Sequence, residues 1–138
     1  MNNNDTIKKE IKNNNQFADK KELANSRFGM KKILNDQYDF LRKFIKKKNS
    51  ILDLGCGTGD FLEYCQKNKL FVKYSGIDPS DRCLELASKK LSSDTNLIHS
   101  DIENITIEKY RNIRPDLIIL RGVIHHLENP MNCMKKIN

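Results

Sequence analysis

The sequence predicts an α/β fold built on a parallel β-sheet. Three observations support this prediction: short apolar runs alternate with stretches of helical spacing, a glycine-rich turn follows the first run, and an acid or a glycine stands near the end of each run. Such alternation joins parallel strands through right-handed crossovers. The expected strands are 51–54, 71–77, 96–99 and 116–120, and the helices expected between them are 59–68 and 80–91.

The first fifty residues differ in composition from the rest of the chain. They contain 13 Lys and Arg against 6 Asp and Glu, whereas residues 51–138 contain 12 of each, so the first fifty carry the whole net charge of +7. Residues 1–20 are predicted to be a disordered tail, because their basic residues are interleaved with asparagines and not with aromatics. The alternative is a basic surface that faces RNA.

Residues 21–50 are predicted to be an N-terminal amphipathic helical segment that precedes the sheet. Its apolar residues recur at helical spacing and are Met30, Ile33, Leu34, Leu41, Phe44 and Ile45. Such a helix could cover a ligand site, which makes Arg27 and Tyr38 candidates to face a substrate. The alternatives are an ordinary surface cation and a half-buried aromatic ring.

The most informative segment spans residues 51–62, where an apolar strand leads through a glycine-rich turn into a helix. Gly55, Gly57 and Gly59 can adopt positive φ angles and lack side chains, so backbone N–H groups can approach a ligand at the helix N-terminus. A dinucleotide fingerprint needs a third glycine where Asp60 stands, and the P-loop sequence Gly-Lys-Ser/Thr is absent. The loop therefore favours another nucleotide-like ligand.

Acidic residues lie beside this loop and at the end of the second expected strand. Asp53 and Asp60 flank the loop and suit a cationic ligand better than a pyrophosphate. Asp78 lies 19 residues beyond Gly59, close to the separation at which an acid reaches the hydroxyls of a ribose. Its alternative role is to cap the next helix, but Ser80 can supply that cap. We therefore interpret Asp78 as a ribose-binding residue.

The third and fourth expected strands also end in polar or glycine residues. Ser100 and Asp101 follow the third strand, and Arg121 and Gly122 follow the fourth. The carboxyl ends of parallel strands meet at one edge of a sheet. The four strand ends therefore predict a single ligand-binding edge.

Four segments together resemble the class I S-adenosylmethionine-dependent methyltransferases, and the last of them is similar to the small-molecule and sugar methyltransferases in particular. They are Ile51 to Leu62, Gly76 to Pro79, Ser100 to Ile102 and Asp116 to Pro130. The resemblance implies S-adenosylmethionine as cofactor and a Rossmann-like, doubly wound parallel sheet. The family's strand order is 3-2-1-4-5-7-6, so the four strands here imply the order 3-2-1-4 with the later strands missing.

The resemblance also implies that residues 51–138 are a partial methyltransferase domain. Without a fifth strand, the edge of the fourth is left open, which is an aggregation hazard and a loss of core. We therefore expect residues 1–138 alone to bind the cofactor and to transfer methyl groups weakly or not at all. We also expect a marginally stable or self-associating protein.

The cofactor-binding residues that the resemblance implies are Asp53, Gly55, Cys56, Gly57, Gly59, Asp78, Pro79, Asp101, Ile102 and Arg121. In the family, the glycine loop lies beside the methionine part of the cofactor, and the acid that matches Asp78 binds the ribose. The position of Asp101 contacts the adenine amino group, with Ile102 alongside the ring. The acid that matches Asp53 and the backbone near Arg121 face the amino group of the methionine part.

A histidine pair follows the fourth expected strand, near the expected place of the transferable methyl group. His126 is the candidate general base, since histidine titrates near neutral pH. The alternatives are a capping or packing histidine and, for His125 and His126 with Glu128, a metal site, which we do not expect. Methyl transfer from a sulfonium often needs only alignment and desolvation, so no base is strictly required.

The remaining composition indicates a cytoplasmic enzyme domain. The four cysteines form no Cys-x-x-Cys pair, which argues against a zinc site and a disulfide framework, and free thiols suit a reducing compartment. The sequence contains neither an apolar run of about 18 residues nor the apolar core of a signal peptide, so we expect no membrane partner.

The sequence therefore predicts methyl transfer from S-adenosylmethionine to a small-molecule acceptor, such as a sugar or another metabolite. Nucleic acid is the less favoured partner, because residues 51–138 are neutral overall. Two alternatives stay open. One is an RNA or protein methyltransferase that uses the basic N-terminal region, and the other is a non-catalytic module that binds the cofactor.

Overall fold

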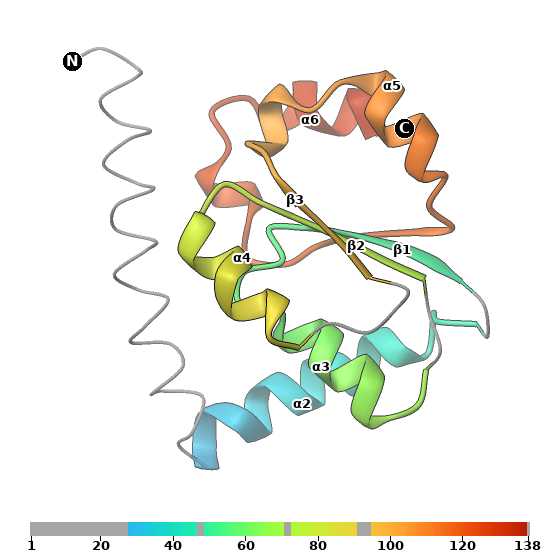
Figure 1. Cartoon of the computed structure of the whole chain (residues 1–138), viewed down its shortest axis with the longest axis vertical. Coiled ribbons are helices and arrows are strands. Elements are labelled where there is room, and N and C mark those ends of the chain that lie inside the picture. The colour runs from blue at the N-terminus through green and yellow to red at the C-terminus, as the bar shows by residue number, and fades with distance from the viewer. Residues whose placement is uncertain (1–27, 47–48, 71–72, 91–94, 138) are drawn as a thin grey trace.

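The computed structural model describes residues 28–46, 49–70, 73–90 and 95–137. Its sheet has four parallel strands in the order β3-β2-β1-β4, which confirms the predicted fold class and strand order (Figure 1). Each strand overlaps the range expected from the sequence. The strands are β1 (Ser50–Leu54), β2 (Lys73–Asp78), β3 (Thr95–His99) and β4 (Leu117–Leu120).

Helices cover both faces of the sheet, so the fold is doubly wound. Figure 1 shows the helices α2, α3 and α4 on one side of the sheet and α5 and α6 on the other. Their bounds are α2 (Phe28–Arg42), α3 (Asp60–Lys67), α4 (Asp81–Ser88), α5 (Ile107–Ile113) and α6 (Pro130–Ile137), with two 3-10 turns, η1 (Ile102–Asn104) and η2 (Ile124–His126). The connections through α3 and α4 therefore cross one face of the sheet, and the connection through α5 crosses the other. The carboxyl ends of all four strands meet at one edge.

Helix α5 is not among the elements expected from the sequence. It has only seven residues, fewer than the window of about 11 residues over which helical periodicity can be recognised. Thr106 begins the helix, because its hydroxyl accepts the backbone N–H of Lys109 at 3.2 Å. Arg114 ends it in the left-handed region, with a φ of 46°.

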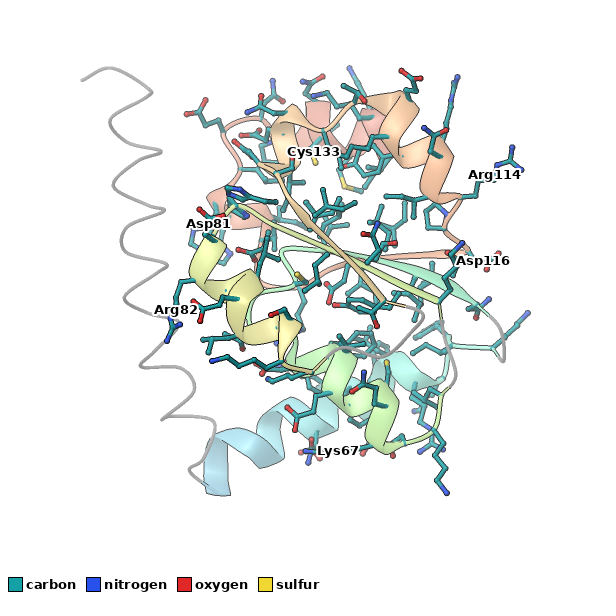
Figure 2. All side chains as sticks on the ribbon, viewed as in Figure 1. Lys67, Asp81, Arg82, Arg114, Asp116 and Cys133 are labelled. Atoms are coloured by element: carbon teal, nitrogen blue, oxygen red, sulfur yellow. The ribbon has the colours of Figure 1, made fainter. Side chains whose placement is uncertain are left out.

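The sheet separates two apolar cores, because successive side chains of a strand point to opposite faces. In β1, Leu52 and Leu54 lie in the core under α5 and α6, and Ile51 lies in the core under α2 and α3. Figure 2 labels Cys133 of α6, which is 1% exposed and belongs to the first of these cores. Full burial of an aliphatic side chain such as that of Leu52 contributes about 1.5–3 kcal/mol to the free energy of unfolding. The central strand β1 is therefore held from both sides, and so is the start of the loop that follows it.

Helix α2 is joined to the second core through Tyr38. This residue is 2% exposed, and its ring lies 5.2 Å from the rings of Phe61 and Tyr64. Phe44, two residues beyond the end of this helix, is 55% exposed. Ile45, the next residue, packs against the second core together with Leu41.

Replacing Tyr110 by phenylalanine is expected to raise the free energy of unfolding by about 1 kcal/mol. The Tyr110 side chain is buried in the core under α5 and α6, and its hydroxyl has no hydrogen-bond partner within the part of the chain that the structure describes. The substitution removes a desolvated polar group and keeps the ring contacts. Urea denaturation followed by circular dichroism measures the change. A clear loss of stability would contradict the prediction, because it would mean that the hydroxyl is hydrogen-bonded.

Candidate cofactor site

The glycine loop between β1 and α3 folds back onto the end of β2. The φ angles of Gly55, Gly57 and Gly59 are 77°, 54° and 75°, a region that other residues adopt only with strain. The backbone N–H groups of Gly55 and Cys56 both donate to the carbonyl oxygen of Ile77, at 2.8 and 3.0 Å. The predicted need for glycine at these three positions agrees with the geometry of the loop.

A segment that follows β4 closes against the same loop. A Cβ atom at Gly55 would lie 2.2 Å from Cγ2 of Val123, which is far inside van der Waals contact. Val123 is itself 8% exposed, so it has little freedom to move away. The absence of a side chain at Gly55 therefore allows the carboxyl ends of β1 and β4 to approach each other closely.

Asp78 links the end of β2 to the glycine loop. Its Oδ2 accepts the backbone N–H of Gly57 at 2.9 Å, and its Oδ1 accepts the backbone N–H of Ser80 at 2.9 Å. The side chain of Ser80 in turn caps α4 by accepting the N–H of Cys83 at 3.1 Å, which confirms that Asp78 is not needed as the cap. Each oxygen of an ionised carboxylate can accept more than one hydrogen bond, so this arrangement is compatible with further acceptance from ribose hydroxyls.

Asp53 lies beneath the loop and contacts a residue that the sequence analysis did not single out. Asp53 is 4% exposed, and the Tyr74 hydroxyl donates a hydrogen bond to its Oδ2 at 2.5 Å. Burial, followed by the negative charge of Asp53, raises the pKa of Tyr74 well above its ordinary value. The one sequence signal for this contact is Gly76, which lies two residues after Tyr74 on the same face of β2 and opposite Asp53 in the register.

Cys56, within the loop, is buried and protonated. Burial raises its pKa well above the usual range, and the negative charges of Asp53 and Asp78 raise it further. A thiol in this state is a poor nucleophile. We therefore interpret Cys56 as a residue that packs beneath the loop and contributes its backbone to it, and not as a nucleophile.

Asp60, at the start of α3, already has a cationic partner within the protein. Its Oδ1 lies 3.2 Å from Nζ of Lys90 and accepts the hydroxyl of Thr58 at 3.0 Å. Lys90 also lies 3.2 Å from Oε2 of Glu63. The interpretation that Asp60 favours a cationic ligand is thus weakened, and Asp53 is the better placed of the two acids that flank the loop.

Asp101 and Ile102 follow β3 and begin the turn η1. Oδ1 of Asp101 accepts the N–H of Glu103 at 3.0 Å, and its Oδ2 accepts the side-chain amide of Asn104 at 3.3 Å. Ile102 is 4% exposed and lies in the core under α5 and α6. The contacts of both residues with an adenine ring stay a prediction, and so does the role of Pro79, whose carbonyl oxygen lies 3.0 Å from Nε2 of His99.

Arg121, at the end of β4, joins the site to helix α2. One of its guanidinium nitrogens donates to the Tyr38 hydroxyl at 2.9 Å, and its Cζ lies 4.9 Å from the centre of the Tyr38 ring. Tyr38 is therefore tied to the binding edge rather than open to a substrate. The other candidate in this segment, Arg27, lies outside the described residues.

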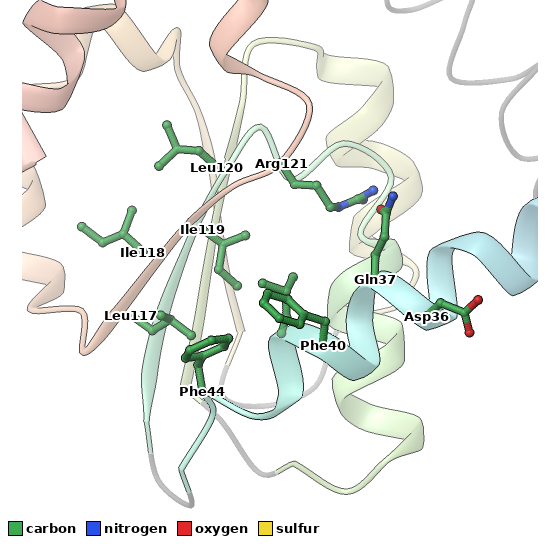
Figure 3. Close-up of a pocket in the computed structure, with 10 residues that line it drawn as sticks. Asp36, Gln37, Phe40, Phe44, Leu117, Ile118, Ile119, Leu120 and Arg121 are labelled. Carbon is green, nitrogen blue, oxygen red and sulfur yellow. The ribbon is translucent and has the colours of Figure 1, made fainter.

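An apolar groove of about 690 Å³ runs along β4 beside α2 (Figure 3). Figure 3 shows Phe40 and Phe44 on one side of it and the length of β4 on the other, with Arg121 extending toward Gln37. Among the described strands, none pairs with this outer edge of β4. The residues that line the groove are Asp36, Gln37, Phe40, Leu41, Phe44, Leu117, Ile118, Ile119, Leu120 and Arg121.

The two histidines after β4 are both exposed. Their ring centroids lie 3.9 Å apart, and the backbone N–H of His126 donates to the carbonyl oxygen of Val123 at 2.8 Å, which forms the turn η2. Across the described ranges, no group of three or more His, Cys, Asp or Glu side chains gathers in a way that could hold a metal ion. The role of His126 as a base stays a prediction.

Comparison with known proteins identifies the class to which this geometry belongs. Residues 27–138 match the family model of the methyltransferase domain, so the chain belongs to that family, and its fold is that of the class I enzymes. It is 33% identical over 90 residues to the malonyl-(acyl-carrier protein) O-methyltransferase of Halalkalibacterium halodurans strain C-125, an alignment that covers 64% of this chain and 33% of that protein.

Two further proteins are similar over parts of the chain. The ubiquinone/menaquinone biosynthesis C-methyltransferase UbiE of Campylobacter jejuni strain 81-176 is 33% identical over 70 residues, which cover 47% of this chain and 29% of that protein. The solved structure of the plantazolicin methyltransferase BpumL with a pentazolic desmethyl analogue and SAH superposes with a TM-score of 0.59 and 26% identity, over 94% of this chain and 54% of that chain.

The chain spans about a third of the length of the curated relatives it matches. No helix within residues 28–46, 49–70, 73–90 and 95–137 is long and apolar enough to cross a membrane.

Proposed function

We propose that this chain is the cofactor-binding part of an S-adenosylmethionine-dependent methyltransferase that acts on a small-molecule acceptor. The observation that carries the proposal is the junction of the glycine loop with the second strand, where the N–H of Gly57 donates to the Asp78 carboxylate at 2.9 Å. This junction brings a glycine-rich loop next to an acid that can accept hydrogen bonds from ribose hydroxyls.

The residues at this edge fit the two ends of the cofactor. Asp78 would accept the ribose hydroxyls, and Asp53 would receive the positively charged amino group of the methionine part, with the glycine loop between them. The backbone near Arg121 would face the same amino group, and Asp101 would accept from the adenine amino group. Two buried carboxylates, at the ends of β1 and β2, suit a ligand that carries hydroxyls and an ammonium group, and they disfavour a pyrophosphate.

The bound cofactor supplies a methyl group on a positively charged sulfur. The protein then has to align the acceptor atom with that methyl group and to exclude water, because charge is lost as the sulfonium becomes a neutral thioether. Val123, which closes against Gly55, is a residue of this chain that excludes water from the loop. In this scheme His126 serves as the base for an acceptor that must lose a proton.

The kinds of relatives support an organic acceptor. One relative is named for malonyl-(acyl-carrier protein) and another for ubiquinone and menaquinone biosynthesis. Residues 51–138 have no excess of positive charge, so this part of the chain has no electrostatic preference for nucleic acid.

The chain is expected to bind S-adenosylmethionine and its demethylated product, S-adenosylhomocysteine, with affinities within about tenfold of each other, because the contacts assigned above are common to both. Isothermal titration calorimetry with each ligand tests this, with NAD and ATP as controls that should not bind. Binding of NAD or ATP in preference to S-adenosylhomocysteine would overturn the proposed function. A screen of metabolite pools for methyl transfer from labelled S-adenosylmethionine then identifies the acceptor.

A further inference from the structure

The Asp53 carboxylate is buried at the end of β1, with an exposed fraction of 4%. The negative charge of Asp53 raises the pKa of four nearby aromatic hydroxyls and thiols, which belong to Tyr38, Cys56, Cys65 and Tyr74. A buried carboxylate requires donors aimed at its oxygens. The Tyr74 hydroxyl is such a donor, and it lies 2.5 Å from Oδ2 of Asp53.

The backbone of β2 is shaped to allow this contact. A Cβ atom at Gly76 would lie 3.0 Å from Cε1 of Tyr74 and 2.8 Å from Sγ of Cys56, so both groups occupy the space where a side chain would be. The Tyr74 ring can therefore extend along the strand over Gly76, toward Asp53, which is paired with Gly76 in the parallel register. Because its pKa is raised by burial and by Asp53, the Tyr74 hydroxyl stays protonated and acts as the donor.

We propose that Tyr74 is a positioning residue, whose hydroxyl holds the Asp53 carboxylate in the orientation that receives the amino group of the cofactor. This inference rests on the proposed function, in which Asp53 binds that amino group. Tyr74 is 1% exposed, so it acts through Asp53 and does not itself contact the ligand. Its contribution is therefore confined to ligands that carry the amino group.

The test compares two ligands that differ in this respect. S-adenosylhomocysteine carries the amino acid part, and 5′-methylthioadenosine has the same adenosine and thioether without it. Calorimetry on the full chain is expected to show that Tyr74→Phe weakens S-adenosylhomocysteine binding about tenfold, the size of a lost hydrogen bond to a charged group. Binding of 5′-methylthioadenosine should change less than about twofold.

Tyr110→Phe is the matched control, since it removes a hydroxyl from another buried tyrosine, on the opposite face of the sheet. It should leave the affinities for both ligands unchanged. Asp53→Asn provides a second background, in which adding Tyr74→Phe should have little further effect, because the two residues act as one unit.

The outcomes separate the inference from the proposed function. If the unmodified chain binds neither ligand, the proposed function fails. If it binds S-adenosylhomocysteine but Tyr74→Phe weakens both ligands equally, or neither, the positioning role is overturned while the proposed function stands. If Tyr74→Phe does not fold, the Asp53→Asn variant decides. An affinity ratio between S-adenosylhomocysteine and 5′-methylthioadenosine equal to that of the unmodified chain would mean that Asp53 does not recognise the amino group. The positioning role of Tyr74, which acts through Asp53, would then be overturned.

Discussion

Asp78→Ala is expected to weaken binding of S-adenosylhomocysteine at least about thirtyfold, which corresponds to about 2 kcal/mol. The substitution removes the acceptor that we assign to the ribose hydroxyls. It also removes the acceptor of the Gly57 and Ser80 N–H groups, at 2.9 Å each, so the glycine loop loses its anchor to β2. Both losses act in the same direction, and calorimetry on the purified variant measures their sum.

A neighbouring acid provides the control for this experiment. Asp81 lies three residues later at the start of α4, its side chain is 80% exposed, and it pairs with His99 at 3.0 Å on the surface. Asp81→Ala should therefore leave cofactor affinity unchanged within about twofold, since exposed ion pairs contribute little. Affinity equal to the unmodified chain in a folded Asp78→Ala protein would exclude Asp78 from the site.

Gly55→Ala is expected to lower the free energy of unfolding by about 2–5 kcal/mol, a large part of the stability of a small domain. Two costs combine. A side chain in the left-handed region, at a φ of 77°, is strained, and the new Cβ atom would lie 2.2 Å from Cγ2 of Val123. Urea denaturation followed by circular dichroism measures the total.

A substitution at Gly122 measures the backbone strain without the steric conflict. It has a similar φ of 66°, but no described atom lies within 4 Å of the position of its Cβ. Gly122→Ala should therefore cost only the backbone strain, about 1–2 kcal/mol. Adding Val123→Ala to the Gly55 variant should recover part of the difference, because it removes the atoms in conflict. Equal losses for Gly55→Ala and Gly122→Ala would contradict the close approach of the β4 segment to the loop.

Much of the fold follows from the sequence by local rules. The position of the glycine loop and the capping role of Ser80 were predictable because each depends on residues within one strand–loop–helix unit, where spacing and backbone preference act directly. The strand order was predictable only through the family resemblance. The family resemblance extended these predictions to the whole sheet edge. Helix α5 was missed because its seven residues are too few to show periodicity.

Other features were decided only by the tertiary structure. The partner of Asp53 is Tyr74, 21 residues away, and the partner of Arg121 is Tyr38, 83 residues away. The charge of Asp60 is balanced by Lys90, which lies just after α4. These contacts join elements that are distant in the chain, and no local pattern encodes which side chains the parallel sheet will bring together.

The sequence by itself therefore determined the class of fold, through the alternation of strand and helix patterns, and the cofactor, through the family resemblance. The tertiary structure decided which groups within the protein each carboxylate pairs with. The physical reason is that a buried charge must find its partners wherever packing places them, and packing is a property of the whole fold.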